Sequence, residues 1–422
     1  MSASKTATPG AVHAPDQIAG PIKPKQRIQA LDVIRGVAIL GILAVNADGF
    51  AAPISASLKP AMWFFPDQGA TAISYWIMDA IFHDKFLAMF SMLFGVSLFL
   101  VGGEVSDKQR SRILARRLFV LFLFGMLHGF GIWWGDILSL YAATGAIMFF
   151  CRSWQSKTLM TLGVIFYAGV NLMNLPMAEL FVHGELVANA VPSPAGLAHL
   201  AAYKAQIAQT LVEAKGSWLG AYSVNAQSYL RVLSGYPRLL LPTLGLMMVG
   251  LSLFKSGFLS AKSSTRMYAI VASCAAPAFA LAAWLCWQQD ITQTPLLGTE
   301  QILVLLAPII VLGYASVIIF ALKAGRSRWL APFAATGRMA FTNYLTQSLI
   351  MTTIFYGGRG ALMGQIDRPG LWLIVIGIWA LQLTWSHFWL ARFDMGPFEW
   401  VWRCLTYGYR VPFLRARQIA AR

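Results

Sequence analysis

Long apolar runs are the feature of this sequence that most restricts its fold. A helix needs about 20 consecutive apolar residues to cross the hydrocarbon core of a bilayer. Ten runs approach that length. We predict one spanning helix over each of the ranges 34–52, 84–103, 116–134, 137–152, 157–176, 237–256, 266–287, 301–323, 337–356 and 370–391. The chain is therefore expected to be an all-α, polytopic membrane bundle.

The composition agrees with a membrane protein. Of the 422 residues, 57% are hydrophobic and only 12% are charged, whereas soluble domains carry about 25% charged residues. The net charge of +16 does not indicate nucleic acid, because the basic residues cluster between apolar runs and form no nucleic-acid-binding module. There is no Walker motif, which argues against ATP hydrolysis. The four cysteines show no metal-ligand spacing, so we expect reduced thiols and no metal.

The positions of Lys and Arg predict an orientation. If ten spans alternate, the basic clusters before the first span and after the second, fourth, sixth, eighth and tenth spans fall on one side. Cytoplasmic loops of membrane proteins carry this excess of positive charge. Both termini are therefore expected in the cytoplasm.

The segments around the spans carry further expectations. Residues 1–29 are expected to be a disordered basic cytoplasmic tail, and residues 414–422 a second basic tail. The transmembrane domain between them covers 30–413. Its segment 177–236 is expected to be a large extracytoplasmic loop, with an amphipathic helix over 195–215 that lies across the outer mouth.

Two short segments are amphipathic instead of uniformly apolar. Residues 72–82 resemble an approach to the second span. Residues 396–410 leave three structures open: an interfacial helix, a re-entrant helix or an eleventh span.

Ionisable residues within apolar runs are the first candidates for a functional site, because they are costly in a bilayer. His128 lies near the midplane of the third span. It is either a neutral histidine that joins two helices by a hydrogen bond, or a general base or proton carrier. Asp136 follows eight residues later, about 12 Å along a continuous helix. We therefore expect no direct bond between the two, and expect Asp136 to line the outer entrance or to cap the fourth span.

Other polar residues lie near the ends of spans. Asp32 and Arg35 are three residues apart and can pair at the inner surface, although Arg35 also suits an anionic ligand such as phosphate. Asn46, deep in the first span, needs a hydrogen bond to another helix or a place in a site. Glu399 and Arg403 are spaced as a helical ion pair.

The ninth span carries a polar stripe along one face. Its members are Thr342, Asn343, Thr346, Gln347 and Thr353. Such a stripe is unfavourable against lipid, so it should face either a solvated substrate cavity or another helix.

Five stretches, taken together and in this order, carry a resemblance to a known family. They are LDVIRGVAILGILAVN, KFLAMFSMLFGVSLFL, LFGMLHGFGIWWGDILSLYAATG, GRMAFTNYLTQS and GPFEWVWRCLTYG. From about residue 27 to 413 the chain resembles the YeiB-like family of bacterial inner-membrane proteins, whose domain has no known function. That family is similar to transmembrane acyltransferases. The resemblance implies a multi-pass protein of the bacterial inner membrane.

The resemblance also bears on the choice of a catalytic base. In the acyltransferases that modify polysaccharides, a histidine follows the arginine of the LDxxRG motif by eleven residues; here that position is Asn46. The lysosomal heparan-glucosaminide acetyltransferase resembles this chain in having asparagine there, and takes its histidine from the luminal stretch that follows. Residues 48–82 of this chain contain no histidine. His128 or His83 must therefore supply the base if acyl transfer is the reaction.

Acyl transfer is the function that this resemblance favours. The donor would be acetyl-CoA or another acyl-CoA in the cytoplasm, with Arg35 and Asp32 at its phosphates. His128 would act as base and Asn46 or Asn343 as an oxyanion donor. Two rival hypotheses remain: a transporter or exporter that uses the same polar residues, and a non-catalytic envelope scaffold.

These hypotheses fix a predicted site. One solvent-reachable cavity is predicted to be lined by His128, Asn46, Asn343 and Gln347. Acceptor contacts are predicted from Asn343, Thr346, Gln347, Glu399 and Arg403. The expected partners are the lipid bilayer and a small-molecule or glycan acceptor, with a homodimer left open and no nucleic acid.

Overall fold

The regular structure of the protein is helical. The computed structural model describes residues 28–57, 59–173, 194–294 and 296–414, and within these ranges the one β-pairing is an isolated bridge between Phe393 and Leu414. The long helices are α1 (Gln29–Ala51), α3 (Ala70–Ile81), α4 (Lys85–Gly102), α5 (Lys108–Gly131), α6 (Leu138–Cys151), α7 (Ser156–Met173), α9 (Pro194–Gly216), α10 (Trp218–Lys255), α11 (Thr265–Asp290), α12 (Thr299–Lys323), α14 (Ala340–Phe355), α15 (Arg368–Arg392) and α16 (Pro397–Tyr407). Short helical turns are α2 (Ile54–Ser57), η2 (Pro60–Met62), η3 (Arg326–Arg328) and α13 (Ala331–Arg338).

The predicted class, an all-α polytopic bundle, is confirmed. Each of the ten predicted spans coincides with a helix, and among the described residues seven segments are long and apolar enough to cross a membrane. One of the seven combines α3 and α4 over Ala70–Gly102. The remaining predicted spans are the shorter helices α6, α7 and α14, of 14, 18 and 16 residues.

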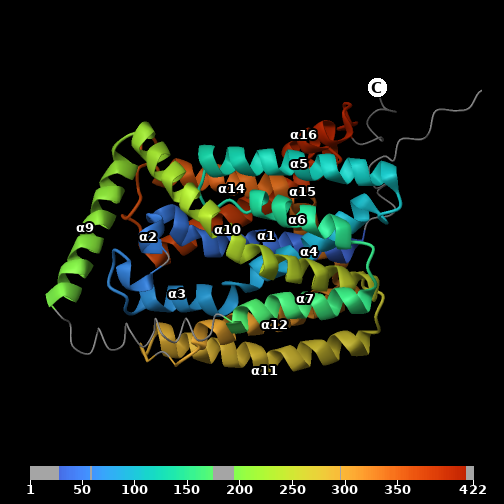
Figure 1. Cartoon of the computed structure of the whole chain (residues 1–422), viewed down its shortest axis with the longest axis horizontal. Helices are drawn as coiled ribbons and strands as arrows, with labels where there is room; N and C mark the ends of the chain where they lie inside the picture. The colour runs from blue at the N-terminus through green and yellow to red at the C-terminus, as the bar shows by residue number, and fades with distance from the viewer. Residues whose placement is uncertain (1–27, 58, 174–193, 295, 415–422) are drawn as a thin grey trace, which may run out of the picture.

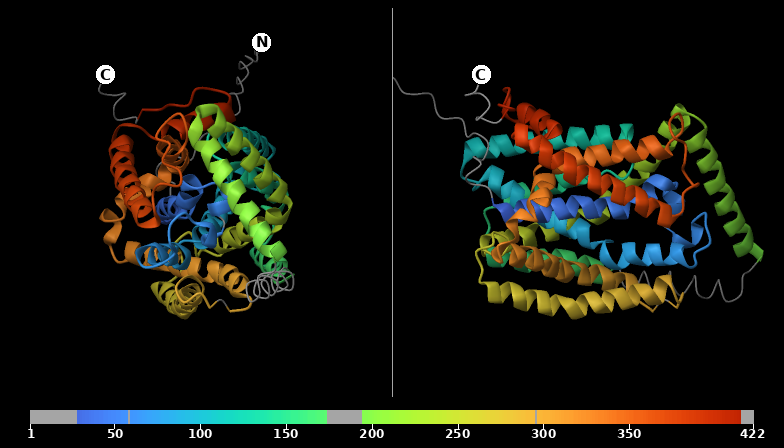
Figure 2. Two further views of the ribbon diagram at one scale, coloured as in Figure 1. Left: turned by 90° about the vertical axis from the view of Figure 1, so that its left-hand side faces the viewer. Right: turned by 180° about the vertical axis from the view of Figure 1, so that it is seen from behind.

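The helices lie side by side and define two ends of the bundle (Figure 1). At one end, called the terminal end here, α1 begins and α16 lies close by; the connections α4–α5, α6–α7 and α10–α11 also lie there. At the opposite end α9 crosses the bundle obliquely, and this is called the α9 end (Figures 1 and 2). Because the described chain begins and ends at the same end of the bundle, it fits an even number of membrane-spanning helices.

Three expectations about the connecting segments need revision or remain outside the described residues. The sixth span was expected to start at 237, but α10 begins at Trp218 and runs for 38 residues, so the second part of the expected loop is helical. The helix α16 has 11 residues, which excludes an eleventh helical span. Most of both predicted tails and part of the predicted loop fall outside the described residues, at 1–27, 415–422 and 174–193.

Two glycines let α1 and α13 pack backbone against backbone. A Cβ on Gly36 would lie 1.9 Å from the Phe333 carbonyl oxygen, and one on Gly337 would lie 1.9 Å from the Asp32 carbonyl oxygen. Small residues permit this close approach between membrane helices. The contact brings the LDxxRG turn of α1 against the start of the ninth predicted span.

Candidate functional site

His128 and Asp136 are in direct contact, contrary to the expectation from their spacing in the sequence. The Nδ1 atom of His128 lies 2.9 Å from Oδ1 of Asp136. The expectation was wrong because it assumed a continuous helix, whereas α5 ends at Gly131. The chain then turns back through 132–137, with the backbone amides of Ile132 and Trp133 both donating to the His128 carbonyl. This turn brings the Asp136 carboxylate beside the imidazole.

Asp136 is fixed by a second set of hydrogen bonds. Its Oδ2 accepts from the Ser139 amide at 2.9 Å and from the Ser139 hydroxyl at 2.6 Å. These bonds cap the first turn of α6, which is one of the two roles expected for Asp136. The Ser139 Oγ atom also lies 2.8 Å from the Tyr229 hydroxyl and 2.6 Å from the Tyr236 hydroxyl. Because Ser139 donates its hydrogen to Asp136, both tyrosines on α10 donate to Ser139.

Ser348 completes the chain on the other side of the imidazole. Its Oγ atom lies 2.9 Å from Nε2 of His128. With the Nδ1 hydrogen donated to Asp136, Nε2 is free to accept the serine hydrogen. The three side chains are almost fully buried, with exposed fractions of 1% for His128, 4% for Asp136 and 1% for Ser348. The order serine, histidine, carboxylate is that of a nucleophile, a base and the group that orients the base.

Several members of this network were missed in the sequence. Ser348 lies one position after Gln347 in the ninth-span motif. Its partner His128 lies on α5, and the sequence does not show that these two helices face each other. Tyr229 and Tyr236 fell in the segment expected to be a loop. Asn225 on α10 also belongs to this group, because its amide donates to the carbonyls of Gly129 and Phe130 and holds the end of α5.

A large cavity opens at the terminal end and reaches toward this network. It has a volume of about 440 Å³. Its charged lining consists of five arginines and two carboxylates: Arg35, Arg110, Arg117, Arg338, Arg403, Asp32 and Glu399. Four of the predicted site residues therefore face one cavity: Asp32, Arg35, Glu399 and Arg403. With all seven groups ionised the lining carries a net charge of +3, which favours an anionic ligand.

The charged residues of the cavity are held in defined positions. Arg35 donates to Asp32 at 3.2 Å, as predicted, and to the Ser97 hydroxyl at 3.3 Å. The guanidinium of Arg117 stacks 3.7 Å from the centre of the Trp402 ring.

Glu399 has a role that its helical spacing did not indicate. Its carboxylate accepts hydrogen bonds from the amides of Phe341 and Thr342, at 2.8 and 3.0 Å, and so caps α14. Burial raises the pKa of the Glu399 carboxyl, while these hydrogen bonds oppose the rise.

Tyr344 stands between the cavity and His128. It lines the cavity together with Ile137 and Leu138, the two residues that follow Asp136. Its ring centre is 5.0 Å from that of His128, and its hydroxyl donates to the Gly135 carbonyl at 3.3 Å. Ser348 follows Tyr344 by one helical turn on α14. Tyr344 therefore lines the cavity on one side and packs near His128 on the other.

The predicted cavity lined by His128, Asn46, Asn343 and Gln347 is wrong. None of the four lines the large cavity. Both amide hydrogens of Gln347 are used, by the Ile39 carbonyl at 3.2 Å and Gln382 at 2.8 Å.

Asn343 and Thr346 are likewise engaged with neighbouring helices. The amide of Asn343 donates to the Thr336 carbonyl and Ser386, and its oxygen accepts from Trp385 at 2.7 Å. The hydroxyl of Thr346 donates within α14 and accepts from the amide of Gln382. These residues of the polar stripe thus join α14 to α15. Of the two surroundings expected for the stripe, a neighbouring helix is the one observed. Asn46 is half-buried on α1.

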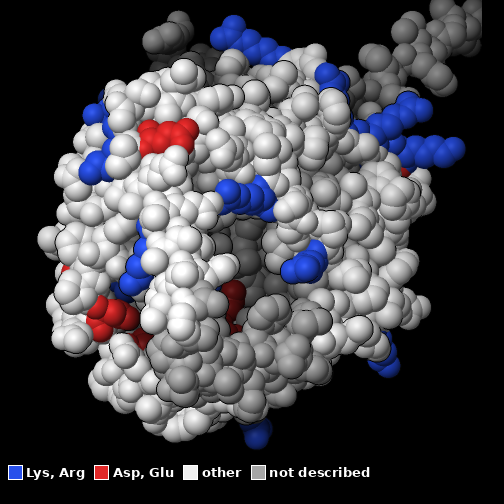
Figure 3. Space-filling view, turned by 60° about the vertical axis from the view of Figure 1, so that its left-hand side comes forward, with Lys and Arg blue, Asp and Glu red and all other residues white. Residues whose placement is uncertain are grey.

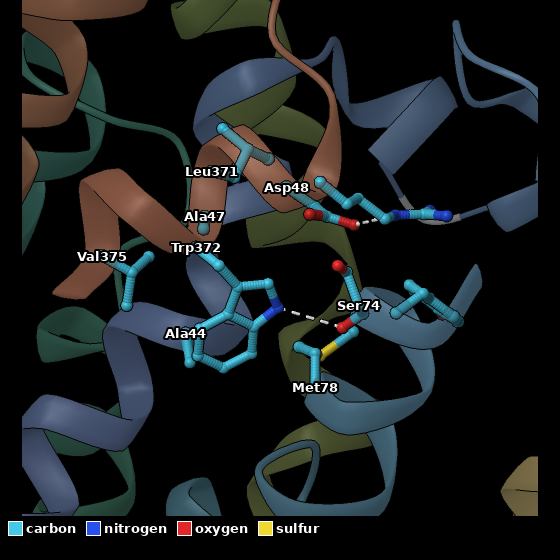
Figure 4. A pocket seen from close by; sticks show the side chains of 10 residues that line it. Ala44, Ala47, Asp48, Ser74, Met78, Leu371, Trp372 and Val375 are labelled. Carbon is cyan, nitrogen blue, oxygen red and sulfur yellow. Dashed lines mark hydrogen bonds and ion pairs between the residues drawn. The ribbon is translucent and has the colours of Figure 1, made fainter. Parts of the chain in front are cut away.

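The α9 end has a smaller polar centre. Figure 3 shows that this face is hollowed, with basic residues at the rim and acidic residues deeper inside. Arg368 is 2% exposed and bonds to Asp48 at 3.1 Å and Asp67 at 3.4 Å. The adjacent cavity, which Asp48 and Trp372 line from different helices (Figure 4), measures about 10 Å³, close to the smallest that holds a water. It is too small for a substrate.

His83, the other candidate base, belongs to a separate charged cluster. It lies in the interruption between α3 and α4, where its Nδ1 atom is 2.7 Å from Oδ1 of Asp79. Lys85 is 1% exposed and donates to the Asp79 carbonyl at 2.8 Å. His83 therefore has a carboxylate partner, although it does not line the large cavity.

Together these observations define a multi-pass helical membrane protein with a buried histidine network beside a basic cavity. Comparison with known proteins places the chain in a family. It is 33% identical over 392 residues to "Uncharacterized protein YeiB" of Escherichia coli (strain K12), covering 90% of this chain and 96% of that protein. The chain therefore belongs to the YeiB-like family, as the sequence motifs suggested.

Other comparisons agree with this assignment. Residues 252–409 match the family described as "Protein of unknown function (DUF418)". The chain is 32% identical to "Uncharacterized protein YxaH" of Bacillus subtilis (strain 168), covering 92% of this chain and 96% of that protein. It is 26% identical to an "Uncharacterized 39.9 kDa protein in amylase 3'region" of Bacillus acidopullulyticus, covering 94% and 99%. No solved structure matches the chain.

Proposed function

We propose that the protein is a membrane acyltransferase of the bacterial inner membrane. The observation that carries this proposal is the hydrogen-bonded chain Asp136–His128–Ser348, with both contacts at 2.9 Å. A carboxylate on Nδ1 holds the imidazole in the tautomer whose Nε2 accepts a proton. Acyl transfer from a thioester to a hydroxyl or amine needs such a base.

The basic cavity supports an acyl-coenzyme A donor, with acetyl-CoA as the first candidate. Its arginines suit the phosphates of the nucleotide, because guanidinium groups form charge-assisted bonds with phosphate oxygens. Along α5, Arg117 and His128 are eleven residues apart, or about 16 Å at 1.5 Å per residue. A donor whose phosphates bind near Arg117 would therefore need an extended arm to reach the base. The pantetheine arm between the nucleotide and the thioester has that form.

The direction of transfer follows from the orientation predicted by the basic residues. The terminal end would face the cytoplasm and the α9 end the outside. The donor would enter from the cytoplasm, and an envelope component, a small molecule or a glycan would receive the acyl group.

A transporter remains the second candidate, because one observation favours it. The chain interrupts its helix between α3 and α4, where Asp84 has a φ of +58°, and the buried Lys85 and the His83–Asp79 pair lie at this interruption. Broken helices with buried charges are common where ions couple to transport.

The test uses purified protein in proteoliposomes with radiolabelled acetyl-CoA and an envelope extract as acceptor source. Acyl transfer predicts release of free coenzyme A thiol, lost in His128→Ala and kept in His387→Ala, since His387 is exposed on α15. Equal thiol release by both variants would contradict His128 as the base, and no thiol release by the wild-type protein would contradict the enzyme. Uptake that depends on Asp79 and not on His128, without thiol release, would support the transporter.

A further inference from the structure

Ser348 is a buried serine on α14 whose hydroxyl oxygen lies 2.9 Å from Nε2 of His128. We propose that Ser348 accepts the acyl group from the donor and forms an acyl-enzyme, so that transfer proceeds in two steps. This inference rests on the proposed function. The geometry supports it because a hydroxyl that donates to a carboxylate-oriented imidazole is the arrangement that activates serine.

Two features of α14 favour a reactive hydroxyl. The Ser348 Oγ atom is 2.9 Å from His128 Nε2 but 3.4 Å from the Tyr344 carbonyl, the usual acceptor for a helical serine. The imidazole is therefore the nearer partner of the serine hydroxyl. The neighbouring positions Asn343 and Gln347 bond to two backbone carbonyls, the Ser386 hydroxyl and the Gln382 amide on other helices, and none of these partners is ionisable. Ser348 alone among these three has a base as its partner.

The first step loads the enzyme. The Ser348 oxygen attacks the thioester carbonyl while His128 takes the serine proton. The carbon–sulfur bond breaks, and the coenzyme A thiol leaves with the proton that His128 returns. The products are an oxygen ester on Ser348 and free thiol.

The second step unloads it. An acceptor hydroxyl or amine attacks the ester while His128 takes its proton, and the carbon–oxygen bond to Ser348 breaks. His128 then returns the proton to the serine oxygen. No oxidant or further reactant is needed. For the first step the thioester must reach Ser348 past Tyr344, which lines the basic cavity.

The proposal predicts a covalent intermediate that can be isolated. Purified protein is incubated with radiolabelled acetyl-CoA without acceptor, quenched in acid and digested, and label is traced by mass spectrometry. We expect label on the peptide that contains Ser348, released by hydroxylamine. Ser348→Ala should abolish labelling and reduce transfer at least about 100-fold, at the lower limit for a general-base step.

Ser386→Ala is the matched control. Ser386 is also a buried helical serine, bonded to Asn343 at 3.0 Å, but it has no contact with His128. Its variant should retain label and transfer, and both variants should be compared at equal folded protein by size exclusion. A second measurement uses an alkyl fluorophosphonate, which labels activated serines without any acyl donor. It should label the wild type and Ser386→Ala but neither Ser348→Ala nor His128→Ala.

The outcomes separate this inference from the proposed function. If transfer depends on His128 but Ser348→Ala transfers at the wild-type rate, the acyltransferase stands and the acyl-enzyme is wrong. If acetyl-CoA is not consumed yet the fluorophosphonate labels Ser348, the nucleophile is supported and the donor is wrong. No label from either reagent on folded protein would overturn the nucleophile.

Discussion

The helix α14 carries two polar networks that differ in what their hydrogen bonds leave available. On one face, Asn343 and Gln347 use all their amide hydrogens to bind α1, α13 and α15. On the other, Ser348 contacts His128, and His128 in turn contacts Asp136. Amide side chains do not ionise near neutral pH, whereas imidazole can take up and release a proton. The first network therefore stabilises the packing, and the second can also move protons.

The largest expected effect falls on the base. His128→Ala should reduce acyl transfer by roughly 10²–10⁴-fold, the usual contribution of a general base. Thiol release at saturating acetyl-CoA measures it, normalised to folded protein. His387→Ala, on an exposed face of the same bundle, should be unchanged, and a similar loss in that variant would point to a general defect.

Asp136→Asn should have the next largest effect. Asparagine still caps α6 but no longer carries the charge that stabilises the protonated imidazole during transfer. Turnover should fall about 10²-fold, within the range for a general-base contribution, and the solvent deuterium isotope effect on turnover should increase. Asp136 acts through His128, so an unchanged isotope effect together with lower stability would indicate a purely structural role.

Arg35→Ala should weaken donor binding more than turnover. Loss of one hydrogen bond to a charged group costs about 1.5–3 kcal/mol, so the half-saturating acetyl-CoA concentration should rise roughly 10- to 100-fold. Arg392→Ala is the control, because Arg392 is exposed and does not line the cavity. If both arginine variants have the same half-saturating concentration, the cavity does not bind the donor phosphates.

Gln347→Met should have the smallest effect on function. It removes two interhelical hydrogen bonds, and each such bond contributes about 0.6–2 kcal/mol in membrane proteins. The free energy of unfolding in detergent should therefore fall by about 1–4 kcal/mol, while turnover per folded molecule is kept. A loss of turnover comparable to that in His128→Ala would remove the distinction between the two networks.

Local patterns in the sequence predicted the helical class, the positions of the spans and the pair Asp32–Arg35. Apolar run length and residue spacing encode these features directly. The contact between His128 and Asp136 was missed because no proline marks the end of α5 at Gly131. The apolar run continues through Trp133 in the sequence, so it suggested that the helix also continued.

The remaining partners depend on which helices face each other. Ser348 and Gln347 are adjacent in sequence and similar in polarity, yet only one faces His128. Tyr229 and Tyr236 lie in a segment whose polar composition suggested a loop, and α10 extends through it. Period and composition do not specify which faces of distant helices meet.

The most direct test of the account replaces His128 with glutamine. Glutamine can keep hydrogen bonds to Asp136 and Ser348 but cannot accept a proton near neutral pH. We predict a His128→Gln protein that keeps most of its unfolding free energy in detergent, yet loses thiol release from acetyl-CoA to the extent that His128→Ala does. Full thiol release by the folded His128→Gln variant would show that the network around α14 only holds helices together, and would contradict the proposed base.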